Sequence, residues 1–230
     1  MKTTSLGKMA TIFTTTAVAT CALSGTAAAT MRFGASGFSG GNWGGYVSSG
    51  SFTSATASWT EPAVTCTSTH DVFAPWVGID GDGSSTVEQV GVATDCSSGS
   101  PQYQAWYEMY PAAPVYYDNP VSAGDKITAT VNRTGTNTYR LVLSDTTQDW
   151  TKTVTKTLSA KHSSAEAIIE SPTDSYPAIN GGIQFTGVKF NDTALATTSP
   201  SSVDADDRGA YTWSPSAIAS DGTDFTMTRH

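Results

Sequence analysis

The side chains of this sequence that are best suited to chemistry are carboxylates. Asp80, Glu108, Glu166 and Glu170 are acids that lie in strand-like segments among aromatic, glycine and small apolar residues. A carboxylate can take a proton from water and return it to a departing group. These residue types therefore predict acid–base chemistry carried out by carboxylates.

Other common catalytic devices are missing from the sequence. There is no Gly-x-Ser-x-Gly motif, and a serine triad would need one of three poorly placed histidines, His70, His162 and His230. There is also no phosphate-binding loop, no dinucleotide fingerprint and no pair of Asp-Thr-Gly or Asp-Ser-Gly triplets. The histidines do not have zinc-ligand spacing, and the Asp80–Gly83 stretch is interpreted as a turn rather than a calcium loop. We expect no metal and no cofactor.

Strand alternation sorts the polar residues onto shared faces, because successive side chains of a strand point to opposite sides. Trp76 shares a face with Asp80, and Trp106 shares one with Glu108. Gln89 lies on the same side of its own strand as Val87 and Gly91. An exposed sheet face seldom carries two tryptophans unless something stacks on them. We therefore expect these faces to line a cleft.

The elements that position these residues are short strands. Apolar and polar residues alternate at 126–131 and 183–190, and the second run changes parity after Thr186-Gly187, which predicts a bulge. Gly, Ser and Asn clusters separate the runs, while Thr197 to Asp207 is polar and is expected to form a surface loop. No long amphipathic helix or internal repeat is found. The pattern predicts an all-β fold, an antiparallel sandwich or barrel.

Composition bounds the class of protein. Residues 1–29 have a weakly basic start, an apolar stretch and small residues at 27–29, the layout of a secretory signal peptide. Residues 30–41 are expected to form a flexible leader or short pro-segment, and 42–230 one domain, a monomer. Removing residues 1–29 leaves 10 basic and 20 acidic residues, a net charge of −10. Such a surface disfavours nucleic acid and anionic membrane as partners, and the chain is expected to be secreted.

The two cysteines outside the predicted signal peptide are expected to be bonded to each other. These are Cys66 and Cys96, since Cys21 is removed with the signal peptide. Two cysteines in an exported protein most often form a disulfide. A thiolate nucleophile is therefore not expected.

Five motifs in register resemble the glutamic peptidases, also called eqolisins or peptidase family G1, which are pepstatin-insensitive acid endopeptidases secreted by fungi. The motifs occur in the order Asn42-Trp-Gly-Gly45, Trp76-Val-Gly-Ile-Asp-Gly81, Gln89-Val-Gly91, Ala105-Trp-Tyr-Glu-Met-Tyr-Pro111 and Ala165-Glu-Ala-Ile-Ile-Glu170. The resemblance covers roughly residues 42–190. It implies a two-sheet sandwich like that of the concanavalin A-type lectins.

The resemblance also implies a site. Matched motif by motif, the catalytic dyad falls on Gln89 and Glu170, with Glu170 as general base and acid and Gln89 stabilising the oxyanion. The supporting, substrate-binding residues fall on Trp76, Asp80, Trp106 and Glu108. Independently of the resemblance, Glu166 is expected to be a solvated or cleft-rim acid rather than a catalytic one. The implied substrates are proteins or peptides.

Some features depart from that pattern, and two other functions remain open. Glu88 stands where the family usually has an aliphatic residue, and only a short leader precedes the domain. One alternative is a carbohydrate-binding module or glycoside hydrolase, with Trp76 and Trp106 stacking sugars and Glu108 and Glu170 as the acid pair. The other is a catalytically inactive binding protein on the same fold.

Overall fold

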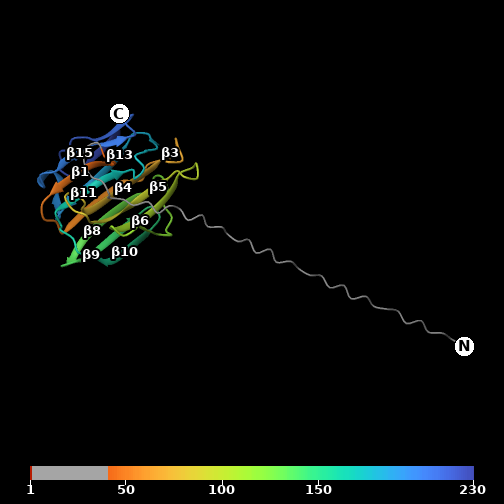
Figure 1. Cartoon of the computed structure of the whole chain (residues 1–230), viewed down its shortest axis with the longest axis horizontal. Helices are drawn as coiled ribbons and strands as arrows, with labels where there is room; N and C mark the ends of the chain where they lie inside the picture. Colours follow the sequence, from red (N-terminus) through yellow and green to blue (C-terminus); the bar gives the residue numbers. More distant parts are fainter. Residues whose placement is uncertain (2–40) are drawn as a thin grey trace.

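Two antiparallel sheets packed face to face form the structure, a computed structural model that describes residue 1 and residues 41–230 (Figure 1). One sheet has seven strands in the order β15-β1-β11-β4-β5-β6-β7. The other has nine strands, in the order β10-β9-β8-β2-β13-β18-β17-β16, with β14 paired to β13. The predicted all-β, antiparallel, two-sheet sandwich is confirmed.

The strands are short, as the alternating runs predicted. The seven-stranded sheet contains β1 (Trp43–Ser49), β4 (Val72–Asp80), β5 (Val87–Asp95), β6 (Gln102–Tyr110), β7 (Val115–Tyr116), β11 (Ser164–Glu170) and β15 (Ser201–Val203). The nine-stranded sheet contains β2 (Ser54–Thr60), β8 (Lys126–Gly135), β9 (Thr138–Asp145), β10 (Trp150–Thr157), β13 (Ile183–Phe190), β14 (Thr193–Ala194), β16 (Ala205–Asp207), β17 (Tyr211–Pro215) and β18 (Phe225–Arg229). A small third sheet pairs β3 (Val64–Thr65) with β12 (Ala178–Ile179), and η1 (Leu195–Thr197) is a single 3-10 turn.

The main core lies between the two large sheets. Alternate residues of each strand point into this core, for example Val77 and Ile79 from β4 and Val131 and Leu141 from the opposite sheet. A second, smaller apolar cluster lies on the other face of the seven-stranded sheet and contains Trp43, Trp76, Trp106 and Ile168. The seven-stranded sheet is therefore buried on both faces, which explains why β4 and β11 have no exposed residue.

One local prediction was confirmed and another was wrong. Pairing between β13 and β2 changes register between Thr186 and Lys189, where the parity change predicted a bulge. The surface loop predicted at 197–207 instead contains β15 and β16, which pair with β1 and β17. Buried Val203 and Ala205 alternate with exposed residues there, and the short alternation was hidden by the many Ser, Thr and Asp side chains.

Cys66 and Cys96 form the predicted disulfide. Cys66 directly follows β3 and Cys96 directly follows β5, so the bond ties the connection before β4 to the end of β5. The two residues are 30 positions apart. The disulfide therefore ties the end of β3, in the small third sheet, to the end of β5 in the seven-stranded sheet.

The double variant Cys66→Ser, Cys96→Ser is expected to lose about 3 kcal/mol of unfolding free energy, because the bond restricts the unfolded chain. Urea denaturation of the variant beside the wild-type protein measures this loss. An unchanged transition midpoint would contradict the expectation.

The predicted signal peptide and the predicted leader up to residue 40 lie outside the described residues. Gly41, the last residue of that leader, forms a bridge to Ala205. Within the described part of the chain, no helix has the length and apolar character needed to cross a membrane.

Candidate active site

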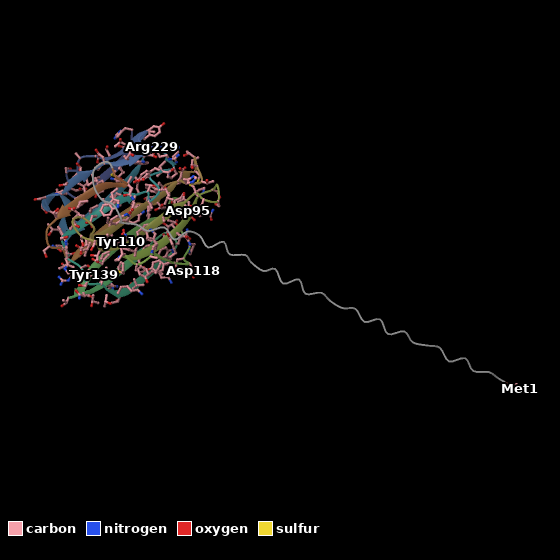
Figure 2. The ribbon with its side chains drawn as sticks, in the orientation of Figure 1. Met1, Asp95, Tyr110, Asp118, Tyr139 and Arg229 are labelled. Carbon is pink, nitrogen blue, oxygen red and sulfur yellow. A yellow bond between two sulfur atoms is a disulfide. The ribbon has the colours of Figure 1, made fainter. Side chains whose placement is uncertain are left out.

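The candidate site lies on the outer face of the seven-stranded sheet, where β1, β11, β4, β5 and β6 run side by side (Figure 1). The strand register places the predicted residues on this face. Gly78 of β4 is opposite Gln89 of β5, and Gln89 is opposite Glu108 of β6. Tyr110, labelled in Figure 2, ends β6 two residues after Glu108. Alternation along neighbouring strands thus brings the amide and the acids together.

Glu170 is the last residue of β11, and both of its carboxylate oxygens are held by neutral donors. Asn42 donates from Nδ2 to Oε1 at 2.9 Å, and Trp76 donates from Nε1 to Oε2 at 3.0 Å. Trp43, next to Asn42, is the register partner of Glu170. The carboxylate is buried. Two fixed donors therefore set the plane of the carboxylate.

Gln89 is held from the other side by Glu108. Its Nε2 donates to Glu108 Oε2 at 2.9 Å, and both side chains are buried. A carboxylate only accepts, so the amide nitrogen rather than the amide oxygen must face Glu108 when that acid is ionised. One hydrogen of the Gln89 amide group remains for another acceptor. Glu108 therefore acts as an orienting group for the amide.

Trp76 lies between the two candidate catalytic strands. β4 separates β11 from β5, and Trp76 is opposite Ile168 on one side and Gly91 on the other. Its indole reaches from Glu170 to the space above Gly78, the residue beside Gln89. Trp76 also packs edge-on against Trp43, with ring centroids 4.9 Å apart. The tryptophan forms the floor between the amide and the acid.

Trp106 extends this apolar floor on β6. It is fully buried, and its register partners are Gly91 of β5 and Tyr116 of β7. Burial raises the pKa of the Tyr116 phenol to about 12, with further contributions from Glu108 and Asp95. Trp106 thus belongs to the same face as the acids, as strand alternation predicted.

Asp80 anchors a loop instead of contacting the dyad. Its carboxylate accepts hydrogen bonds from the backbone N–H groups of His162 and Ser163, at 2.7 and 2.9 Å, and from Ser163 Oγ at 3.1 Å. Asp80 and Gly81 both have positive φ, and a Cβ on Gly81 would lie 2.7 Å from the Trp43 ring. The turn after β4 therefore bends over the edge of the site, and Asp80 holds the loop before β11 against it.

The prediction that Glu166 is a solvated rim acid was wrong. Glu166 is fully buried on the same face as Glu170 and accepts a hydrogen bond from Ser164 Oγ. It lies on β11 opposite Gly78. Glu166 has the same parity on β11 as Glu170, but its burial depends on the neighbouring strands β1 and β4, which the local pattern does not specify.

Sequence reasoning also missed the role of Asn42. The residue was part of a matched motif, but no role was assigned to it, and only the structure shows that it holds Glu170. A signal existed, because a buried polar residue beside a buried tryptophan needs a hydrogen-bond partner.

Among the described residues, no group of three or more His, Cys, Asp or Glu side chains is arranged to hold a metal ion.

Comparison with known proteins identifies the family. Residues 41–228 match the model described as the peptidase A4 family. The chain belongs to the peptidase A4 family. Among curated proteins, the A4 chain is similar to Aspergillopepsin-2 of Aspergillus niger, with 46% identity over 61 residues. That match spans 26% of this chain and about a fifth, 22%, of the relative.

Solved structures share the A4 fold with this chain. A crystal structure of scytalido-glutamic peptidase with a transition state analog inhibitor gives a TM-score of 0.69 at 21% identity, covering 83% of this chain and 98% of that one. The structure of aspergilloglutamic peptidase from Aspergillus niger gives a TM-score of 0.57 at 25% identity, covering 70% and 99%. The resemblance to the glutamic peptidases, predicted from five motifs, is confirmed.

Proposed function

We propose that this chain is a secreted endopeptidase that hydrolyses peptide bonds of proteins in acid, using Glu170 and Gln89 as a catalytic dyad. The observation that carries the proposal is the pair of fixed hydrogen-bond sets on one sheet face. Glu170 is oriented by Asn42 and Trp76, and Gln89 by Glu108. A preorganised carboxylate can supply the proton transfers of amide hydrolysis, and a preorganised amide can supply a donor to the oxyanion. Membership of the A4 family supports peptide bonds as the substrate.

The proposed mechanism follows from these orientations. Glu170, as a carboxylate, takes a proton from the water that attacks the scissile carbonyl, and then returns it to the departing nitrogen. Gln89 donates the hydrogen that Glu108 leaves free to the developing oxyanion. Glutamine is uncharged at every pH, so its donor does not depend on the acidity of the medium. Trp76 and Trp106 are fully buried and pack beneath the polar residues of the site face, so their proposed role is to support the dyad.

The predicted signal peptide at 1–29 and the disulfide between Cys66 and Cys96 support secretion, because disulfides persist in oxidising compartments. The absence of paired Asp-Thr-Gly triplets from the sequence supports insensitivity to pepstatin. The carbohydrate alternative has less support, because Trp76 and Trp106 are both fully buried and Trp76 Nε1 is engaged by Glu170. A sugar-stacking tryptophan needs an accessible ring face.

Digestion of a denatured protein in acid, with pepstatin present, tests the function. Wild type is expected to cleave it, and Gln89→Ala is expected to lower kcat by about 10²- to 10³-fold, the usual cost of one oxyanion donor. The KM is expected to change less, because the donor acts mainly in the transition state. Glycan release without proteolysis would favour a glycoside hydrolase, and full inhibition by pepstatin would refute the dyad.

A further inference from the structure

The backbone of Asn42, whose side chain donates to Glu170, lies just beyond the end of a strand ladder. Asn42 precedes β1, and the pairing of β1 with β11 ends at Trp43 and Glu170. The Asn42 carbonyl oxygen continues the ladder by one bond, because it accepts from the Ser171 N–H at 3.2 Å. The direction of the Asn42 side chain therefore depends on how firmly this carbonyl group is held.

Tyr176 gives the same carbonyl oxygen a second hydrogen bond. Its phenol O–H donates to Asn42 O at 2.7 Å, and both residues are buried. Tyr176 lies in the loop between β11 and β12, directly downstream of the strand that ends at Glu170. The chain that leaves the strand of the proposed base thus turns back to contact the residue that orients this base.

The turn that returns Tyr176 to Asn42 is itself fixed by hydrogen bonds. Ser171 Oγ donates to the Ser175 carbonyl oxygen at 2.9 Å and accepts from the Ser175 N–H at 3.0 Å. Ser175 also bonds to the chain at the start of β4. Its carbonyl oxygen accepts from the Val72 N–H at 2.9 Å, and its Oγ donates to Asp71 Oδ1 at 2.6 Å. Tyr176 therefore follows a turn that is tied both to itself and to the sheet.

The ring of Tyr176 is fixed by the main core between the sheets. It is fully buried, and its centroid lies 6.4 Å from that of Phe73 and 5.7 Å from that of Trp213. Trp43, the register partner of Glu170, belongs instead to the smaller cluster on the outer face. The Asn42 carbonyl group is thus a point at which a side chain of the main core bonds to the backbone of the site face.

The surroundings of Tyr176 keep its phenol protonated. Burial raises the pKa of Tyr176 well above its usual value, and the charge of Glu170 adds to this, while a backbone hydrogen bond from Ser171 acts in the other direction. A phenol that stays protonated keeps its O–H as a donor. The hydrogen bond to Asn42 therefore does not vary with the acidity of the medium.

We propose that Tyr176 is a positioning residue that acts on Glu170 through Asn42. Its hydroxyl group fixes the Asn42 carbonyl, and the fixed backbone directs Asn42 Nδ2 towards Glu170 Oε1. The carboxylate is thereby held in the plane in which it takes a proton from water. Tyr176 itself makes no contact with the substrate in this role. The inference rests on the proposed function of Glu170 as the general base.

Tyr176→Phe tests the inference, because it keeps the buried ring and removes only the hydroxyl group. The variant is expected to lower kcat in acid about fivefold, the scale of one hydrogen bond. The KM is expected to stay nearly unchanged, because the orientation of the base is altered and the groups that bind substrate are not. Thermal unfolding is recorded for every variant, and kinetics are compared at a temperature at which all of them are folded.

Tyr46→Phe is the matched control. Tyr46 lies on β1, and its hydroxyl group also donates to a main-chain carbonyl oxygen, that of Ser216, at 2.8 Å. This variant therefore loses the same kind of bond at a place that does not contact Asn42. It is expected to keep the wild-type kcat. An equal loss of kcat in Tyr46→Phe and Tyr176→Phe would mean that any lost hydroxyl group lowers activity, and the inference would be wrong.

The double variant Asn42→Ala, Tyr176→Phe decides whether Tyr176 acts through Asn42. If it does, the kcat of the double variant matches that of Asn42→Ala to within about twofold, because the residue that transmits the effect is already gone. Losses that multiply would show two independent effects and would overturn the inference. A wild-type kcat in Tyr176→Phe would overturn it as well.

An NMR measurement separates this inference from the proposed function. The side-chain amide resonance of Asn42, assigned by its loss in Asn42→Ala, is expected to shift in Tyr176→Phe and in Glu170→Gln but not in Tyr46→Phe. A chain that cleaves no protein yet shows these shifts would refute the peptidase and support the positioning role. An Asn42 resonance that is unchanged in Tyr176→Phe would overturn the positioning role even in an active enzyme.

Discussion

Glu170→Gln is expected to lower kcat for peptide hydrolysis on the order of 10³-fold, within the range that one acid–base group contributes. The substitution keeps the size of the side chain but removes its ability to take a proton from water. It also replaces one acceptor oxygen by an NH₂ group that faces the donor Asn42 Nδ2 or Trp76 Nε1. The carboxylate is thus lost both as a base and as the centre of its hydrogen-bond set.

Steady-state kinetics on a peptide substrate in acid measure this effect. Thermal unfolding of Glu170→Gln must be recorded beside wild type, because the donor–donor contact destabilises the site. Asn42→Ala is the companion variant, since it removes one donor and keeps the carboxylate. It is expected to retain much more activity than Glu170→Gln. Turnover at the wild-type rate in Glu170→Gln would refute its role as general base.

Stability is expected to fall steeply as the pH rises from acid to mildly alkaline values. All five glutamates of the chain are buried, and two of them have large pKa shifts outside the catalytic contacts. Burial, followed by the charge of Asp80, raises the pKa of Glu88 to about 9. Burial also raises the pKa of Glu61 to about 8, although hydrogen bonds from Trp59 and Thr94 act against it.

The direction of this change in stability follows from how many protons the folded and the unfolded chain bind. Above the ordinary glutamate value of 4.5, the unfolded chain releases these protons while the folded chain still holds them. Folding then depends on proton uptake, so the unfolding free energy falls by about 1.4 kcal/mol per pH unit and per group. For Glu61 the loss ends near pH 8, and for Glu88 near pH 9. Together, the two losses of unfolding free energy are large enough to remove much of a typical stability of about 5–15 kcal/mol.

Thermal unfolding between acid and mildly alkaline pH tests this expectation. Wild type should have its highest melting temperature in acid, and that temperature should fall progressively above pH 4.5. Glu88→Gln, which has no proton to lose, should show a shallower decline. Asp192→Asn, a change at an exposed acid, is the matched control and should follow wild type. A Glu88→Gln curve parallel to that of wild type would show that Glu88 does not cause the dependence.

Much of the fold could be predicted because its signals are local. A strand alternates with period two, so the parity of Val77 and Ile79 against Trp76 identified the two faces of β4 without knowledge of its neighbours. The wrong prediction of a loop at 197–207 also arose from reading local alternation. Strands of three residues that contain mostly Ser and Asp give too little contrast between their faces, and β15 and β16 exist because β1 and β17 offer edges to pair with.

The site was predictable by residue type but not by contact. Motif order selected Gln89 and Glu170, and alternation placed Glu108 on the same strand face as Trp106. Which donor meets which acid depends on strand order and register, and Asn42 and Glu170, which meet in the site, are 128 residues apart. For this reason the sequence did not reveal that Asn42 holds Glu170.

The sequence by itself therefore determined the all-β class, the two faces of the longer strands, the disulfide between Cys66 and Cys96 and the family motifs, because each follows from local periodicity, cysteine count or motif spacing. Only the tertiary structure decided the environment of each carboxylate. Glu88, Glu166 and Glu170 have the same side chain but different surroundings. Glu88 points to the core side of β5, Glu166 lies opposite Gly78, and Glu170 lies between two neutral donors. Burial and hydrogen bonding, which set what a carboxylate can do, come from the neighbouring strands.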